Sequence, residues 1–266
     1  MDFLVIGSSM AFIAYMLATL AIITRLFHPN GPNLEQVLIL ATTAIAIHLF
    51  NDAQLFFYDD SINFNLPNVI SLVSLIITIT ISIVALRIKV NLLLPVIYGF
   101  AGIWQLARIF IPNSEAIPLV ADKIILVSHI SLALIAYCIL IIATLYAFQV
   151  SYINLKLKSK NLTAVVHLPP LMQVEKQLFN ILAIGTLCLL ASQLIGLLFL
   201  EGFFAKENIH KTVLSLIALL IYAVILIGHY LQGWRGHRVL LLTVSASALL
   251  TLSYFGSRFV KEFLLS

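Results

Sequence analysis

The sequence predicts an all-α integral membrane protein, a polytopic bundle of about eight transmembrane helices with both termini outside. Of its 266 residues, 62% are hydrophobic and 10% are charged, whereas soluble chains average about 45–50% apolar and about 25% charged residues. The apolar residues also fall into eight runs, each with at least the roughly 20 residues that a helix needs to cross about 30 Å of hydrocarbon. Basic residues concentrate in alternate connections between these runs, as expected of a chain that crosses a membrane repeatedly.

Each run is predicted to be helical, because a single strand in lipid would leave its backbone polar groups unpaired. Turn-forming residues separate the runs, as in Pro29–Pro32, Asp59–Ser61 and Pro169-Pro170. The predicted spans are Phe3–Leu26, Glu35–Phe57, Leu66–Ile88, Leu92–Ile111, Ala121–Tyr152, Gln177–Leu200, His210–Gln232 and Val239–Val260.

The charge distribution predicts the orientation and the class of the protein. By the positive-inside rule, the connections that carry most of the Lys and Arg residues lie in the cytoplasm. We therefore expect one transmembrane domain over residues 1–266 in the bacterial inner membrane, in contact with the lipid bilayer. There is no Walker loop, no GxGxxG after a strand and no HExxH, so a self-contained enzyme is not expected. No basic patch interleaved with aromatic residues indicates nucleic-acid binding.

Histidines dominate the ionisable residues within the predicted spans. His48 and His129 lie at similar depths, about 12–14 Å below the outer surface by helical rise. His210 begins the seventh span and His229 lies near its inner end. A separation of about 28 Å along that helix prevents these two from ligating one metal ion.

The roles of these residues have more than one interpretation. Two imidazoles at one depth suit bis-histidine ligation of haem iron, and they equally suit interhelical hydrogen bonds. Arg108, in the fourth span, is predicted to snorkel to the outer surface. The alternatives are pairing with a haem propionate or with Glu115.

The last third of the chain contains several distinctive motifs. Residues 229–238 read His-Tyr-Leu-Gln-Gly-Trp-Arg-Gly-His-Arg, and Tyr254-Phe255-Gly256 follows in the last span. Earlier motifs are His129-Ile130-Ser131 and, at residues 168–171, Leu-Pro-Pro-Leu. Together these resemble the cytochrome c assembly proteins of the CcsA/ResC/CcmC type, and most closely their smaller YpjD-like branch. The resemblance is strongest over residues 120–260.

The resemblance implies a membrane protein that binds b-type haem through histidines and works with other cytochrome c maturation proteins. On matching positions, His229 corresponds to a ligand within the membrane and His129 to a ligand of an outer haem site. His48 corresponds more loosely to the second ligand within the membrane. The family's tryptophan-rich segment is missing, because residues 202–209 contain no tryptophan. His210 is the candidate for the family's second outer histidine.

Three functions follow from these patterns, and the first is our main prediction. It is a membrane protein that binds, transports or chaperones haem near cytochrome c assembly. The second is a haem-free membrane scaffold or regulatory subunit, which would explain the missing tryptophans. The third is a small-molecule or ion transporter, which ranks last because no Asp or Glu is placed in the middle of a predicted span.

Overall fold

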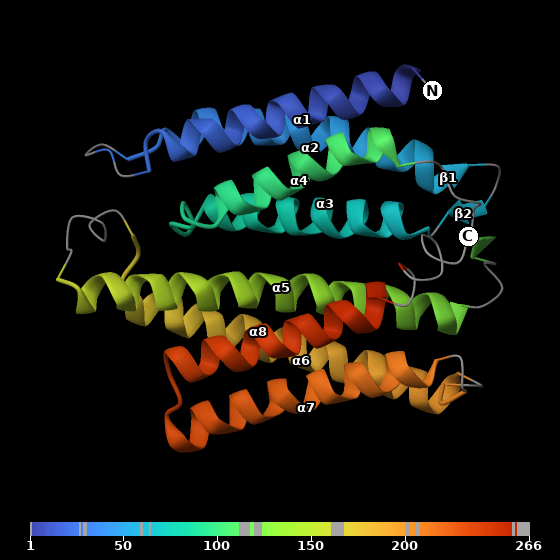
Figure 1. The fold of residues 1–266 in the computed structure, drawn as a ribbon, viewed down its shortest axis with the longest axis vertical. Helices are drawn as coiled ribbons and strands as arrows, with labels where there is room; N and C mark the ends of the chain where they lie inside the picture. The colour runs from blue at the N-terminus through green and yellow to red at the C-terminus, as the bar shows by residue number, and fades with distance from the viewer. Residues whose placement is uncertain are drawn as a thin grey trace. The chain divides into compact units, whose positions relative to one another are not determined.

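Eight α-helices make up most of the described chain in the computed structural model (Figure 1). The structure describes residues 2–26, 28, 31–58, 61–63, 65–111, 118–119, 124–160, 168–200, 203–205, 208–256 and 259. The helices are α1 Asp2–Ile23, α2 Leu34–Phe56, α3 Leu66–Ala85, α4 Leu94–Phe110, α5 Ile124–Lys158, α6 Leu171–Phe199, α7 Ile209–Gln232 and α8 His237–Thr251.

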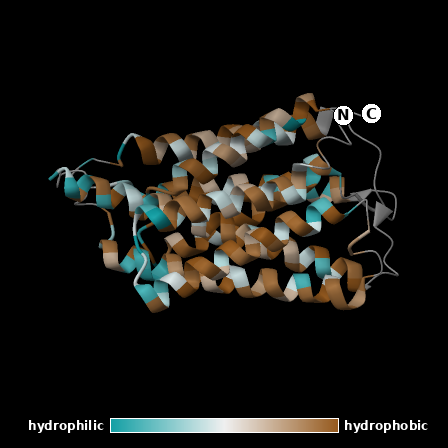
Figure 2. Cartoon of the chain, turned by 60° about the horizontal axis from the view of Figure 1, so that its bottom comes forward, coloured by the Kyte–Doolittle hydropathy of each residue, from teal (hydrophilic) through white to brown (hydrophobic). Residues whose placement is uncertain are grey.

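The helices confirm the predicted multi-span membrane fold. Within the described residues, seven helical segments of at least 20 residues are long and apolar enough to cross a membrane. The remaining helix is α4, with 17 residues, and it begins with Pro95 in its first turn, where a proline needs no backbone donor. Apolar residues run along the bodies of the helices (Figure 2).

The chain divides into two compact units. Unit 1 comprises the described residues of 1–120 and 160–169, and unit 2 those of 121–159 and 170–266. Each unit contains four of the eight helices and has its own set of helix contacts. The prediction of a single transmembrane domain over residues 1–266 therefore stays a prediction.

Unit 1 is built around α1, which packs against α2 and α4, while α3 contacts both α2 and α4. The backbones of α1 and α4 approach closely at Gly102, where an added Cβ would lie 3.1 Å from the Tyr15 Cβ. Ala11, Tyr15 and Ala18 of α1 are fully buried, and their spacing places them on one face of the helix. On this buried face of α1, the large Tyr15 side chain therefore lies between two small alanines.

A short three-stranded sheet belongs to unit 1 and adds strands to the predicted all-helical fold. Strand β1 (Phe57–Tyr58) pairs antiparallel with β2 (Ser61–Asn63), which pairs antiparallel with β3 (Pro118–Leu119). Between β2 and α3, the Asn65 side chain accepts a hydrogen bond from the Asn68 backbone N–H and caps α3.

Unit 2 is organised on the long pair α5 and α6, with α8 against α5 and α7 against α6 and α8. At Gly185 the two long helices approach closely, since an added Cβ would lie 2.9 Å from the Leu140 side chain. Helix α5 continues past the predicted end at Tyr152 to Lys158, and α6 starts at Leu171 rather than Gln177. Pro170, whose φ is fixed by its ring, is the N-cap residue of α6, so the helix begins before the predicted span does.

The last predicted span changes its helical geometry near its end. After α8, residues Leu252–Gly256 form a π-helix, η1, which contains the Tyr-Phe-Gly motif. The Tyr137 ring of α5 contacts Tyr254 and Phe255, and its hydroxyl lies 3.0 Å from the Thr251 hydroxyl. The motif therefore fixes the end of α8 against α5, and π-helical turns of this kind are frequent at functional sites.

Candidate functional site

The two units contain different predicted histidines. His48 lies in α2 of unit 1, whereas His129 of α5, together with His210 and His229 of α7, belongs to unit 2. His48 is fully buried, His129 and His229 are partly buried, and His210 is exposed. Their surroundings differ in the one property that decides iron binding, which is whether a ring nitrogen keeps an available lone pair.

His48 is held by hydrogen bonds at both of its ring nitrogens. The Tyr15 hydroxyl lies 3.1 Å from Nδ1, and the Ser71 hydroxyl lies 2.9 Å from Nε2. The Asp52 carboxylate is also 3.3 Å from Nε2. Because α1, α2 and α3 each contribute one of these groups, the imidazole joins three helices within the bundle.

The protons of this cluster can be assigned from the partners. The single hydroxyl proton of Ser71 is donated to Asp52 Oδ1 at 2.8 Å, so His48 Nε2 must donate to Ser71. In a neutral imidazole Nδ1 is then the acceptor, and the Tyr15 hydroxyl donates to it. Neither nitrogen of His48 is left for a metal ion in this arrangement. Of the open interpretations, the interhelical hydrogen bond is the one that the geometry favours.

Arg108 does not snorkel, and this prediction was wrong. Its side chain is buried and donates to Asp52 Oδ1 at 2.7 Å and to the Asn68 amide oxygen. Glu115, the carboxylate considered at first, lies outside the described residues. Asp52, near the end of the predicted span Glu35–Phe57, lies within α2 and is 2% exposed. Asp52 was not predicted as the partner of Arg108, because hydropathy assigned this aspartate to the end of the second span.

The sequence did contain a signal for this buried cluster. On α3 the polar residues Asn68, Ser71, Ser74 and Thr78 are all buried, and their spacing of three or four residues places them on one helical face. Such a stripe in an apolar helix predicts a polar partner on a neighbouring helix. Within this stripe, Ser71 contacts His48 and Asp52, and Asn68 accepts a hydrogen bond from Arg108.

Among the described residues, His129 forms hydrogen bonds through one ring nitrogen, Nδ1. Its Nδ1 lies 2.8 Å from the Ser192 backbone carbonyl oxygen of α6, and the Ser192 hydroxyl donates back to the His129 carbonyl at 3.1 Å. Gly196, one turn further along α6, leaves the space that the ring occupies, because an added Cβ would lie 2.9 Å from His129 Cε1. Phe203 packs edge-on against the ring.

His229 is held by the turn that follows it. Gly233 adopts a left-handed conformation, with φ 67°, and reverses the chain. The Trp234 carbonyl oxygen then lies 3.0 Å from His229 Nδ1, and the indole packs on Gly228, where an added Cβ would lie 2.4 Å from Trp234 Cδ2. Phe179 of α6 stacks on the imidazole with 3.3 Å between ring centroids. The Gly-Trp-Arg-Gly motif therefore orients the histidine.

His129 and His229 share one arrangement of protons. A carbonyl oxygen can only accept a hydrogen bond, so Nδ1 must be the protonated nitrogen in each ring. In the neutral imidazole the Nε2 atom then carries the lone pair. Metal-ligating histidines are commonly oriented in this way, with the other N–H donated to a backbone carbonyl. Both residues are therefore chemically able to ligate iron.

These two histidines lie too far apart to share an iron atom. His229 contacts α6 at Phe179, whereas His129 contacts it at Ser192. The two contact residues are thirteen positions apart, which corresponds to about 20 Å of helix. His210 lies at the same end of unit 2 as His129, since neighbouring Thr212 donates to the carbonyl of Phe203, which packs on His129. No group of three or more His, Cys, Asp or Glu side chains in the described chain forms a metal cluster.

Comparison with known proteins decides the family. The family model described as "Cytochrome C assembly protein" matches residues 6–265. The chain belongs to this family. It is 41% identical to the inner membrane protein YpjD of Escherichia coli over 255 residues, which cover 95% of this chain and 97% of that protein, and the same match is found in three strains.

A more distant relative and the search of solved structures complete the comparison. An uncharacterized 28.8 kDa protein of Azospirillum brasilense is 31% identical over 141 residues, about half of either chain. No solved structure matches. With its helices of spanning length, the chain is a multi-pass protein of the bacterial inner membrane. Members of its family serve cytochrome c assembly, and the predicted recognition is confirmed.

Proposed function

We propose that this protein binds haem through the histidines of unit 2 and handles it in connection with cytochrome c assembly. One observation carries the proposal: His129 and His229 each direct Nδ1 at a backbone carbonyl oxygen, at 2.8 and 3.0 Å. Each ring therefore keeps an Nε2 lone pair. Bound haem would supply an iron that accepts axial imidazole nitrogens.

The two histidines belong to separate sites in this proposal, because about 20 Å of α6 lies between their contacts. His210 is our candidate for a second ligand at the end where His129 lies. His48 is left out, since iron could bind there only after Tyr15 or Ser71 gave up a hydrogen bond. This narrows the predicted set of four histidines to three.

The surroundings of His229 also limit how haem would bind. The hollow that Glu175, Phe179 and Gly236 line is closely packed, with about 0 Å³ open to a molecule the size of water, whereas typical small-molecule pockets hold roughly 300–1,000 Å³. This hollow beside Phe179 therefore has no room for a porphyrin. The stacked Phe179 ring limits how far the His229 imidazole can rotate.

The test is the haem content of protein purified in detergent from haem-replete cells, measured by absorption in the oxidised and the dithionite-reduced states. We expect a Soret band in the wild type, a partial loss in His129→Ala or His229→Ala, and a complete loss in the double variant. His237→Ala is the matched control, because His237 is exposed at the start of α8. A double variant with unchanged haem content would refute the proposal.

The haem-free scaffold remains the second candidate, and the environment of His48 favours it. That histidine is fully buried and hydrogen-bonded at both ring nitrogens, which supports a role for it in holding the helices together. A colourless protein that fails to take up added hemin and copurifies with one partner at fixed stoichiometry would support this function instead.

A further inference from the structure

Two adjoining hollows lie at the end of unit 1 where α3 ends and α2 begins. One is lined by the turn before α2 and by the segment after α3, including Arg87 and Lys89. The other is lined by the first turns of α2, from Leu34 to Thr43. Leu34 and Leu86 line both hollows, so together they form one groove, which we call the α2–α3 groove. Its volume near α2 is about 600 Å³.

The α2–α3 groove changes from polar to apolar along its length. Its polar end presents two cations, and neither Arg87 nor Lys89 forms an ion pair with any residue that the structure describes. The backbone there is fixed, because Val90 and Leu93 beyond the turn are buried and hydrogen-bonded to each other. These two exposed cations thus occupy a defined position at the mouth of the groove, where an anion would complement them.

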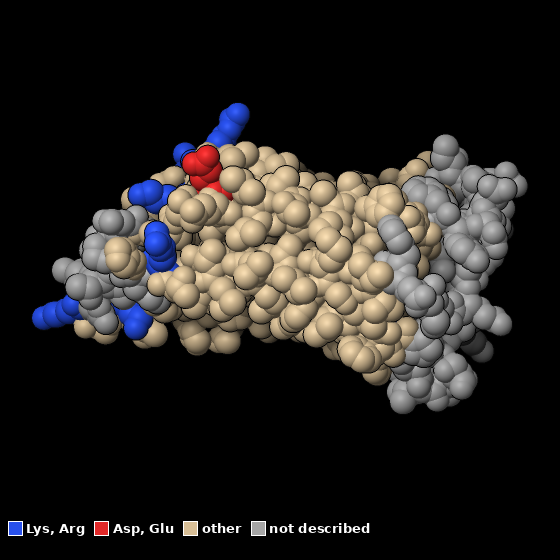
Figure 3. Space-filling view, turned by 90° about the horizontal axis from the view of Figure 1, so that it is seen from above, with Lys and Arg blue, Asp and Glu red and all other residues tan. Residues whose placement is uncertain are grey.

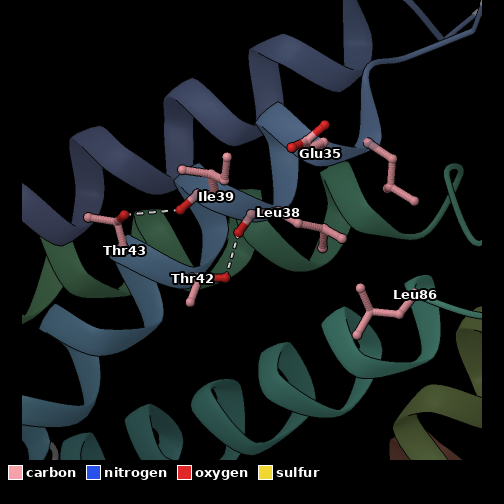
Figure 4. A pocket seen from close by; sticks show the side chains of 7 residues that line it. Glu35, Leu38, Ile39, Thr42, Thr43 and Leu86 are labelled. Atoms are coloured by element: carbon pink, nitrogen blue, oxygen red, sulfur yellow. Dashed lines mark hydrogen bonds between the residues drawn. The ribbon is translucent and has the colours of Figure 1, made fainter.

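The deeper part of the groove is apolar although two threonines line it (Figure 4). The Thr42 hydroxyl donates to the Leu38 carbonyl at 2.6 Å, and the Thr43 hydroxyl donates to the Ile39 carbonyl at 3.0 Å. Both hydroxyls are therefore satisfied by their own helix, and only methyl groups remain for a ligand. With the exposed Leu86 side chain opposite, this wall suits a hydrocarbon chain.

The length of the groove matches one leaflet of a membrane. From Leu34 to Thr43 the helix rises about 14 Å, which is close to half of the roughly 30 Å hydrocarbon thickness. The basic residues then lie at the level of the headgroups. The Lys and Arg side chains in Figure 3 gather towards one end of the view, and a long uncharged surface follows them.

From these observations we infer that the α2–α3 groove binds an anionic phospholipid of the phosphatidylglycerol kind. The phosphate lies between Arg87 and Lys89, and one acyl chain follows Leu38 and Thr42 into the leaflet. Glu35 carries the only negative charge among the described residues that line the groove. It can accept a hydrogen bond from a glycerol hydroxyl, whereas a choline headgroup has no donor to offer. The inference does not depend on haem binding.

Native mass spectrometry of the full-length protein in detergent tests this site, with dioleoyl-phosphatidylglycerol and dioleoyl-phosphatidylcholine as the probes. Wild-type protein should prefer the first lipid. Replacing both cations, R87Q with K89Q, should weaken its binding about thirty-fold, since each basic residue near a membrane surface contributes roughly a five-fold effect. The matched control is R25Q with R238Q, which removes two exposed cations that do not line the groove.

A second pair of variants tests the apolar wall independently of charge. Thr42→Trp fills the groove and should abolish the lipid preference, whereas Leu49→Trp, on an exposed part of α2 outside the groove, should leave it unchanged. Soluble glycerol 3-phosphate should not displace the lipid. The inference is overturned if the charge-removing variant binds like its control, if Thr42→Trp keeps the preference, or if the soluble phosphate competes.

Discussion

The buried ion pair of unit 1 gives the sharpest prediction about stability. Asp52 accepts hydrogen bonds from Arg108 at 2.7 Å and from Ser71 at 2.8 Å, and both charged side chains are at most 8% exposed. Asp52→Asn keeps the shape of the side chain but leaves the guanidinium buried without a countercharge. Removing one partner of a buried pair costs about 3–5 kcal/mol, so we expect a loss of that size in the free energy of unfolding.

A double-mutant cycle with Arg108→Gln separates charge pairing from ordinary hydrogen bonding. The double variant contains no buried charge at this site and should recover much of the loss, which gives a coupling energy of at least about 2 kcal/mol. Interhelical hydrogen bonds in membrane proteins average only about 0.6 kcal/mol in such cycles. The assay is reversible unfolding in mixed detergent micelles at increasing sodium dodecyl sulfate.

An ion pair of unit 2 provides the control for this cycle. Arg235 Nε lies 3.6 Å from Glu175 Oε1, and the arginine side chain is 56% exposed. The coupling energy between these two residues should therefore stay below about 1 kcal/mol. A coupling energy of that small size between Asp52 and Arg108 would refute the reasoning, because it would mean that the buried charges do not depend on one another.

Two further predictions concern the groups that orient the histidines. Gly228→Ala places a Cβ 2.4 Å from Trp234 Cδ2, so the indole must move. We expect this to lower the free energy of unfolding by about 1–3 kcal/mol. It should also reduce haem content, because the Trp234 carbonyl that orients His229 is displaced. Tyr15→Phe removes the hydroxyl that lies 3.1 Å from His48 Nδ1; it should lower the free energy of unfolding by about 1 kcal/mol and leave the haem spectrum unchanged. Absorption spectra and detergent unfolding of each variant measure both effects, and a loss of haem in Tyr15→Phe would restore His48 as a ligand.

Much of the fold could be predicted from the sequence, because the lipid bilayer imposes a length on every apolar run. Eight runs of spanning length predict eight helices, and the helices appear at those places. The ends of helices were less predictable, since α5 and α6 continue beyond the apolar residues. A helix can extend past the hydrocarbon when its backbone bonds stay satisfied, and hydropathy does not detect such an extension.

The candidate site was predictable as a set of residues but not as an arrangement. Position along a helix follows from the sequence, so the separation of His210 from His229 could be worked out in advance. Which groups face one another across helices does not follow from it. Arg108 of α4 shows the difference. The sequence placed this cation in a span, but only the packing of α2, α3 and α4 brought Asp52 of α2 and Asn68 of α3 to it.

By itself, the sequence determined the membrane class, the number of helices and the family, and it named the candidate histidines. Tertiary structure decided how each histidine is used. His48 meets a hydroxyl at each nitrogen, whereas His129 and His229 each meet a backbone carbonyl at Nδ1. The physical reason is that proton placement on an imidazole depends on whether its partner donates or accepts, and these partners come from other helices or from a turn beyond the helix end.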